Sequence, residues 1–574
     1  MNRTVADAPL FEQAAQAYAQ GRRAQAAQLA RRLVRRSPQH TGAWFLLGSV
    51  LLDEGRADEA LPCLQSAARL APTHPGILRA IGSAYFNRQQ WQEAARQFDL
   101  ALHHGPADAG LLNNFGVALK ELGDSGAAVA VYRRALQLAP NDARIHNNLA
   151  LALNREHDYA AAIEAYRRST ELDPKNAAVW TNLATLLEQT NRLDETEEVL
   201  ARALQLDPHS ARLALVAAKC LRRRGDTESA IARLQDALKQ TSLNSELARS
   251  LEFELGRDYD LLGDSDQAYR HFECGNRLTL EAWPELADGA RAYLAELDSL
   301  LEICTSAWLR ALPSALPEDP GLQTALLVSF PRSGTTLMDT FLDAHPKVRV
   351  LEEEPCLEQV LDRIRALPGS YPQAVASLGA GQLAELRTLY LNAVTKLAQP
   401  QPEMLVVDKN PFYSTHAAFI RQLLPGTRFI FALRHPCDVV LSCFMQPFGR
   451  NPVLANFTDL DASAQVYRRV MDLWLRYRDA LALKVHEWRY EQLVADTRAS
   501  LQALLEFLGL GWSEELSDHT AHAQRRGRIY TPSYHQVIRP VYGDAVNRWR
   551  RYQGHFGAAL DLLRPYAQHF GYRI

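Results

Sequence analysis

The sequence has little cysteine, almost no net charge and no long apolar run. Seven cysteines in 574 residues, with no Cys-x-x-Cys spacing, argue against a disulfide scaffold and against a cysteine-based metal site. A net charge of −3 argues against nucleic acid as the main partner. No apolar run approaches the roughly 18 residues that cross a bilayer, and the first residues lack the apolar core of a signal peptide. These absences predict a reduced, metal-free cytoplasmic protein without a membrane span.

Prolines recur every 34 residues in the first half of the chain, at positions 38, 72, 106, 140, 174 and 208. Small residues such as Gly82 and Gly116 keep the same phase, and large ones such as Phe98 and Tyr132 lie between them. Small residues let two helices approach closely, and proline ends each helical pair. The period resembles that of tetratricopeptide proteins, which implies an all-α superhelix of about eight repeats over residues 7–282.

Asparagines stand at matching places in successive repeats, on the helix that is expected to line the concave side. An asparagine amide pairs with both a C=O and an N–H group, so a ladder of amides suits an extended peptide backbone. We therefore expect Asn114, Asn148 and Asn182 to hold a protein or peptide in the groove. The alternative is that these amides only cap local backbone or face water.

The second half of the chain has a different pattern. Residues 283–321 contain one more helical stretch and then three closely spaced prolines, which predicts a stiff linker. Over residues 322–574, apolar runs of strand length at 324–330, 405–409, 428–434 and 484–490 alternate with helical stretches. This order predicts an α/β P-loop-like domain with a central parallel sheet, and ligands are then expected beyond the carboxyl ends of the strands.

The first candidate site is the segment Pro331-Arg-Ser-Gly-Thr-Thr336, between a predicted strand and a predicted helix. Backbone N–H groups of such a turn, the helix dipole and the side chains of Arg332, Thr335 and Thr336 would together bind an anion. The segment resembles the 5′-phosphosulfate loop of sulfotransferases, whose donor is 3′-phosphoadenosine 5′-phosphosulfate (PAPS). That resemblance implies cofactor binding by Arg332, Ser333, Gly334, Thr335 and Thr336. A generic phosphate loop or a turn without a ligand remains the alternative.

The second candidate site is Arg434, at the end of a predicted strand, with Ser442 eight residues later on the following helix. A guanidinium and a hydroxyl at this spacing reach one phosphate. The pair resembles the 3′-phosphate motif of sulfotransferases, and no divalent metal is implied. The alternative is an arginine that pairs with a surface carboxylate.

Further segments resemble those of tyrosylprotein sulfotransferases. The resemblance implies that Glu353 is the catalytic base, that Lys409 and Ser533 join Arg332 as catalytic residues, and that Tyr490 and Arg548 contact the cofactor. Two departures are visible, because Glu354-Pro355 and His435-Pro436 replace the residues usual in that class. Three consecutive glutamates are also typical of a solvated turn, and a lysine after a strand is often on the surface. The competing bases are histidines: His345, His416 and His435.

The sequence thus predicts a tetratricopeptide superhelix followed by a sulfotransferase domain that acts on tyrosine of a presented polypeptide. Seven arginines against one acid between Arg525 and Arg551 fit a segment that folds over a nucleotide, since aromatic residues for base stacking are sparse there. The alternatives are a sulfotransferase for carbohydrates or small molecules and a non-catalytic tetratricopeptide scaffold.

Overall fold

The computed structural model describes residues 3–240, 243–313, 315–318, 321–518, 543 and 545–574. The chain separates into two compact units, residues 1–216 and residues 217–574. The sequence-based division into 7–282, 283–321 and 322–574 remains a prediction.

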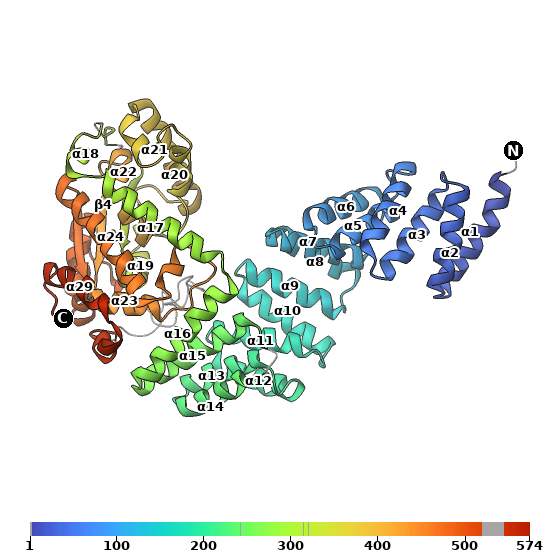
Figure 1. Cartoon of the computed structure of the whole chain (residues 1–574), viewed down its shortest axis with the longest axis horizontal. Coiled ribbons are helices and arrows are strands. Elements are labelled where there is room, and N and C mark those ends of the chain that lie inside the picture. Colours follow the sequence, from blue (N-terminus) through green and yellow to red (C-terminus); the bar gives the residue numbers. More distant parts are fainter. Residues whose placement is uncertain (1–2, 241–242, 314, 319–320, 519–542, 544) are drawn as a thin grey trace. The chain divides into compact units, whose positions relative to one another are not determined.

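The first part of the chain consists of antiparallel helical pairs (Figure 1). Eight pairs lie in the described residues up to Ala282, and the division between the compact units falls within the seventh pair. Their bounds are α1 Arg3–Ala19, α2 Arg23–Arg36, α3 Thr41–Asp53, α4 Ala57–Leu70, α5 Pro75–Asn87, α6 Trp91–His104, α7 Ala109–Glu121, α8 Ser125–Leu138, α9 Ala143–Arg155, α10 Tyr159–Leu172, α11 Ala177–Gln189, α12 Leu193–Leu206, α13 Ala211–Arg223, α14 Thr227–Leu238, α15 Ser245–Leu262 and α16 Ser265–Ala282.

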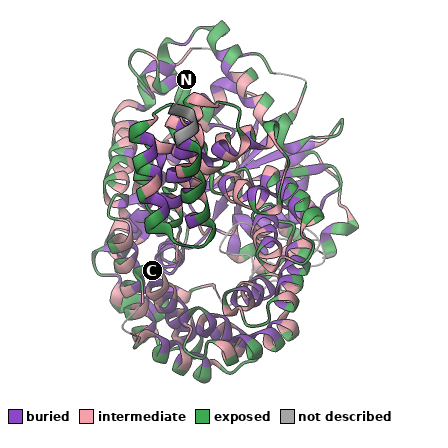
Figure 2. Cartoon of the chain, turned by 90° about the vertical axis from the view of Figure 1, so that its right-hand side faces the viewer, coloured by how far each residue is buried: buried purple, intermediate pink, exposed green. Residues whose placement is uncertain are grey.

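The small residues of the repeat are required by the packing within each pair. A Cβ atom at Gly82 would lie 2.6 Å from the Phe98 ring, and one at Gly116 would lie 2.6 Å from the Tyr132 ring. Both rings are fully buried, so a larger residue would push the two helices apart. In Figure 2 the buried residues concentrate where paired helices meet and along the strands.

The second unit contains a five-stranded, all-parallel sheet in the order β2-β3-β1-β4-β5. The strands are β1 Gln323–Ser329, β2 Val348–Glu352, β3 Leu405–Lys409, β4 Arg428–Leu433 and β5 Val485–Arg489. The chain adds β2 and β3 on one side of β1, and then crosses to add β4 and β5 on the other. A crevice forms at such a reversal, beyond the carboxyl ends of the strands.

Helices cover both faces of the sheet, because alternate residues of each strand point to opposite faces. Leu326 and Val328 of β1 belong to one core, and Ala325 and Leu327 belong to the other. The remaining helices are α17 Leu286–Ile303, α18 Ser306–Arg310, α19 Thr335–Ala344, α20 Glu358–Arg365, α21 Ala380–Ala398, α22 Ala417–Leu423, α23 Pro436–Phe444, α24 Leu460–Leu481, α25 Tyr490–Ala495, α26 Thr497–Leu508 and α29 Ala558–His569. Short 3₁₀ helices are η1 Gln373–Ser377, η2 Pro411–His416, η3 Leu454–Phe457, η4 Glu514–Asp518 and η5 Arg548–His555.

The last helical pair, α15 and α16, is part of the core of the sheet unit. Phe253 and Phe272 of this pair are fully buried in the same apolar cluster as Leu297 of α17 and Val328 of β1. The end of the repeat pattern is therefore also a structural component of the α/β unit.

The predicted fold class is confirmed, since helical repeats precede a parallel sheet covered by helices. Strand β2 was not predicted, although its alternating valines at 348 and 350 were a usable signal. No helix in the described ranges is long and apolar enough to span a membrane.

Candidate active site

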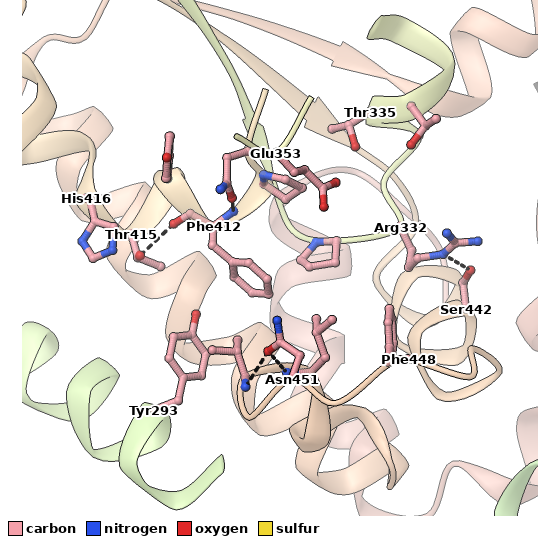
Figure 3. Close-up of a pocket in the computed structure, with 18 of the residues that line it drawn as sticks. Tyr293, Arg332, Thr335, Glu353, Phe412, Thr415, His416, Ser442, Phe448 and Asn451 are labelled. Carbon is pink, nitrogen blue, oxygen red and sulfur yellow. Dashed lines mark hydrogen bonds between the residues drawn. The ribbon is translucent and has the colours of Figure 1, made fainter. Parts of the chain in front are cut away.

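The polar residues predicted to form a site gather at the carboxyl edge of the sheet. Strand β1 leads into the 331–336 loop, β2 into Glu353, β4 into Arg434 and β5 into Tyr490. They surround a cavity of about 650 Å³ (Figure 3). Its lining includes Tyr293, Arg332, Gly334, Thr335, Thr336, Glu353, Phe412, His416, Arg434, Ser442, Phe448, Asn451, Tyr490 and Arg548.

The loop after β1 has an unusual backbone that exposes donors. Arg332 and Gly334 have positive φ angles of 69° and 97°, and the turn leads directly into α19. A Cβ atom at Gly334 would lie 2.7 Å from the Tyr490 ring, so only glycine fits there. Within the described part of the chain, the N–H groups of Ser333, Gly334 and Thr335 make no hydrogen bond. Free N–H groups at a helix N-terminus form a binding site for an anion.

Arg434 holds this loop from the neighbouring strand. Its Nη1 donates to the carbonyl oxygen of Arg332 at 3.0 Å, and its Nη2 donates to the carbonyl oxygen of Ala545 at 2.7 Å. Its guanidinium also lies over the Tyr490 ring, 4.7 Å from the centroid. The buried Nε has no hydrogen-bond partner among the described residues. These two hydrogen bonds use two of the five N–H groups of the guanidinium, and Arg434 lines the cavity, so donors remain for a ligand.

Ser442 connects the two candidate phosphate sites. Its Oγ accepts a hydrogen bond from Arg332 Nε at 3.2 Å, and both side chains line the cavity. Figure 3 shows this pair on one side of the cavity, near Thr335. The two clusters of donors, about a hundred residues apart in sequence, thus lie around one space.

Glu353 stands at the start of the loop after β2 and contacts Lys409. Its backbone has a φ of 55°, a strained value for a residue with a side chain, and its N–H donates to the Lys409 carbonyl at 2.8 Å. Its Oε1 lies 2.9 Å from Lys409 Nζ, and 49% of its side chain is exposed. Glu353 is therefore a carboxylate on the cavity wall, held at both backbone and side chain.

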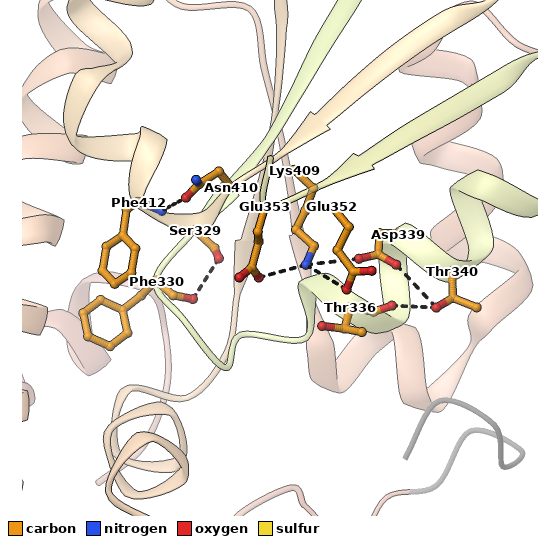
Figure 4. A network of polar contacts seen from close by, with 10 residues as sticks. All are labelled: Ser329, Phe330, Thr336, Asp339, Thr340, Glu352, Glu353, Lys409, Asn410 and Phe412. Atoms are coloured by element: carbon orange, nitrogen blue, oxygen red, sulfur yellow. Dashed lines mark hydrogen bonds and ion pairs between the residues drawn. The ribbon is translucent and has the colours of Figure 1, made fainter. Parts of the chain in front are cut away.

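Lys409 is fully buried. Its ammonium lies between the carboxylates of Glu353 and Glu352 (Figure 4). Its Nζ also lies 3.3 Å from Asp339 Oδ2 and 3.5 Å from Glu352 Oε1. Burial alone would lower the pKa of Lys409, but the carboxylates of Asp339, Glu353 and Glu352 raise it above its ordinary value. Lys409 is therefore a permanent cation that contacts three carboxylates and not the cavity.

The competing histidines have structural contacts. His345 accepts a hydrogen bond from the Lys347 N–H, and His435 accepts one from the Cys437 N–H at the start of α23. His416 lines the cavity, but its Nδ1 is 2.8 Å from the Tyr371 hydroxyl. Burial, together with the charge of Arg365, lowers the pKa of His416 to about 3.

Two predicted residues come from the last part of the chain. Arg548, the first residue of η5, lines the cavity. Ser533 lies outside the described residues, so its role remains a prediction. No group of side chains in the described ranges has the composition of a metal site.

The apolar side of the cavity, formed by residues outside the two phosphate-binding motifs, was not predicted from the sequence. Tyr293 of α17, Phe412 of η2 and Phe448 form an apolar wall there, and the Tyr293 and Phe412 rings meet edge to face at 5.9 Å. Figure 3 shows Phe412 between Tyr293 and the Arg332–Ser442 pair. These residues come from three separate segments, which no local motif would connect.

The asparagines of the repeats lie within the first unit and are half-buried. Asn148 Nδ2 donates to Asn113 Oδ1 at 2.8 Å, and Asn113 Nδ2 is 3.4 Å from Asn114 Oδ1. Asparagine side chains of two successive repeats are therefore hydrogen-bonded to each other, and their role in peptide binding remains a prediction. Asn182 occupies the equivalent place on α11.

Family models match both halves of the chain. Residues 325–514 match the sulfotransferase family. Tetratricopeptide repeats match residues 11–75, 51–114, 113–177, 153–205 and 192–252.

Several characterised and uncharacterised proteins are similar in sequence. An uncharacterized protein of Aquifex aeolicus is 24% identical over 349 residues, which cover 59% of this chain and 44% of that protein. Protein-tyrosine sulfotransferase 2 of Gallus gallus is 29% identical over 236 residues, which cover 38% of this chain and 61% of that enzyme. For protein-tyrosine sulfotransferase A of Caenorhabditis elegans the identity is 26% over 255 residues, or 42% and 65% of the two chains. The chain thus spans less than two thirds of the length of each of these relatives.

Among solved structures, YrrB, a TPR protein with an unusual peptide-binding site, superimposes with a TM-score of 0.31. It is 20% identical and covers 33% of this chain and 96% of its own. This score is too low to support a comparison of sites.

Proposed function

Because the chain joins tetratricopeptide repeats to a domain of the sulfotransferase family, we propose that it transfers a sulfuryl group from PAPS to a hydroxyl acceptor, tyrosine of a polypeptide. One observation carries the proposal. Arg332, Arg434 and Ser442, from two separate motifs, surround one cavity, and Glu353 lies on the wall of the same cavity.

The residues present fit a nucleotide with two phosphate-bearing ends. The free N–H groups of Ser333, Gly334 and Thr335 and the guanidinium of Arg332 suit the 5′ end, where the sulfate is attached. Ser442 and Arg434, which both line the cavity, suit the 3′-phosphate. When bound, PAPS supplies a sulfuryl group on a good leaving group, the 5′-phosphate.

Glu353 supplies the base that the acceptor needs. A tyrosine hydroxyl has a pKa near 10 and is a poor nucleophile at neutral pH, so a base must accept its proton as the bond to sulfur forms. In the in-line displacement the new O–S bond forms while the S–O bond to the phosphate breaks, and the electron pair leaves with the phosphate. The loop donors and Arg332 stabilise the charge on that phosphate.

In this arrangement Lys409 acts through Glu353. Its Nζ is buried and contacts Glu353 Oε1 at 2.9 Å, so it fixes the orientation of the base. The two further carboxylates around Lys409 hold the ammonium in place.

The repeats would present the polypeptide. Asn114, Asn148 and Asn182 are at equivalent places on the first helices of successive repeats, and a row of amides binds backbone with little sequence preference. The contact of Asn148 with Asn113 orders the row before a peptide arrives.

The test is transfer of labelled sulfate from PAPS into a cell extract. Label in protein supports the proposal, label in glycans or small molecules supports the second candidate, and no label supports a scaffold. Glu353→Gln should lower the turnover number about 10²- to 10⁴-fold with unchanged donor affinity, as expected for loss of a general base. Glu354→Gln is the matched control, because this adjacent carboxylate does not line the cavity. Equal activity of both variants would refute the assignment of the base.

A further inference from the structure

The side of the cavity that would bind the sulfate donor, lined by Arg332, Arg434, Ser442 and Arg548, is called here the donor side. One of these residues, Arg548, is held by a helix of the last repeat-like pair, α15. Arg548, on the cavity wall, forms a two-point ion pair with Asp260 near the end of α15. Its Nε is 3.2 Å from Asp260 Oδ1, and its Nη2 contacts Oδ2. The remaining nitrogen, Nη1, has no partner among the described residues. The N–H groups of Nη1 are thus available to an anion in the cavity.

Asp260 is the centre of a buried cluster. Only 7% of the residue is exposed, and it also accepts hydrogen bonds from Arg551 Nη2 at 3.1 Å and from the Tyr552 hydroxyl at 2.6 Å. The carboxylate therefore has a fixed position before any ligand binds. Through its ion pair it also fixes the orientation of the Arg548 side chain.

The backbone of Arg548 is fixed independently by another element. Asp438 in the first turn of α23 accepts hydrogen bonds from the N–H groups of Asn547 at 2.7 Å and Trp549 at 2.8 Å. The backbone around Arg548 thus belongs to the sheet domain, whereas its side chain is directed by α15. A change at Asp260 should free the side chain without releasing the backbone.

The same helical pair braces the helix that carries Ser442. Asn276 of α16 donates to the carbonyl oxygen of Phe444, the last residue of α23, at 2.9 Å. The Tyr269 ring stacks on Phe444 at 5.1 Å and on His555 at 4.2 Å. The pair α15–α16 is therefore in contact with both segments that border the donor side.

We infer that Asp260 is a positioning residue for the sulfate donor, because it orients Arg548 toward a phosphate of the nucleotide. This role rests on the proposed function. A free arginine side chain samples many rotamers, so the fraction of molecules with the guanidinium at the phosphate falls when its partner is removed. The last repeat-like hairpin thereby takes part in donor binding.

The test measures binding of 3′-phosphoadenosine 5′-phosphate to the full-length chain by calorimetry. Asp260→Asn should weaken binding about tenfold or more, the loss expected for one charge-assisted hydrogen bond. The KM for PAPS should rise equally, and the turnover number at saturating PAPS should stay within about twofold, because the base is unaffected. Asp266→Asn is the matched control, since Asp266 lies on the same hairpin and pairs with His555.

A double-mutant cycle with Arg548→Gln separates positioning from general damage. If Asp260 acts through Arg548, the double variant binds no more weakly than Arg548→Gln alone. Additive losses, or unchanged binding by a folded Asp260→Asn, would overturn the inference. If Asp260→Asn does not fold, Asp260→Glu replaces it, because this variant keeps the charge but displaces it. Asp260→Glu should have a melting temperature similar to that of the wild type and should bind the nucleotide more weakly. Equal binding would overturn the inference. A wild-type chain that binds no nucleotide would overturn the proposed function as well.

Discussion

Arg434 offers the sharpest test of the donor site. Its two charge-assisted hydrogen bonds to the carbonyls of Arg332 and Ala545 are each worth about 1.5–3 kcal/mol, so their loss in Arg434→Ala removes about 3–6 kcal/mol. Part of this lowers the free energy of unfolding, and part loosens the loop that binds the donor. A direct phosphate contact would add a similar amount for one bond. We expect the Kd for 3′-phosphoadenosine 5′-phosphate to rise at least about 100-fold, or about 3 kcal/mol.

Arg428 provides the control on the same strand. It lies at the opposite end of β4 and donates to the Leu508 carbonyl at 2.7 Å, away from the cavity. Arg428→Ala should therefore lower the melting temperature without changing the Kd. Calorimetry and thermal unfolding of both variants give the comparison. If Arg434→Ala binds the nucleotide within about threefold of Arg428→Ala, the two motifs do not form one donor site.

Three further outcomes follow from the geometry. Burial raises the pKa of Asp408 to about 7 from an ordinary 3.8, so the folded state loses stability as the pH rises from 4 to 7. The variant Asp408→Asn should therefore have a free energy of unfolding up to about 4 kcal/mol higher than that of the wild type above pH 7, and an equal one below pH 4. Denaturant titrations at both pH values measure the difference. A chain without residues 1–216 should bind nucleotide, whereas one without residues 1–282 should be insoluble or unfolded, because it loses Phe253 and Phe272 at about 3–5 kcal/mol each; equal solubility would contradict this. Asn148→Ala should raise the KM for a protein acceptor but not for a short tyrosine peptide, and equal changes would contradict peptide holding by the repeats.

The sequence was informative where residues close together in the chain determine the local structure. The period of the prolines and small residues predicted the helical pairs, and the glycines pack against rings as the spacing required. The 331–336 segment and the Arg434–Ser442 pair each contain their own strand end and helix start. Their convergence on one cavity followed from the parallel order of the strands.

The rest depended on contacts between distant segments. Lys409 was predicted to be a catalytic residue, but nothing near it in sequence indicated that Asp339 would approach it from α19. The apolar wall combines α17, η2 and the segment around Phe448, which share no motif. Asp260 sits in a stretch whose pattern indicated only another repeat. Its partner Arg548 is 288 residues away.

The dual membership of α15 and α16 limits how this protein could have been assembled or could be redesigned. A foreign repeat array cannot simply be exchanged at the linker, since a graft there would discard the aspartate that holds Arg548 and the rings that support α23. A working chimera would keep the native chain from residue 217 onward and vary only what precedes it.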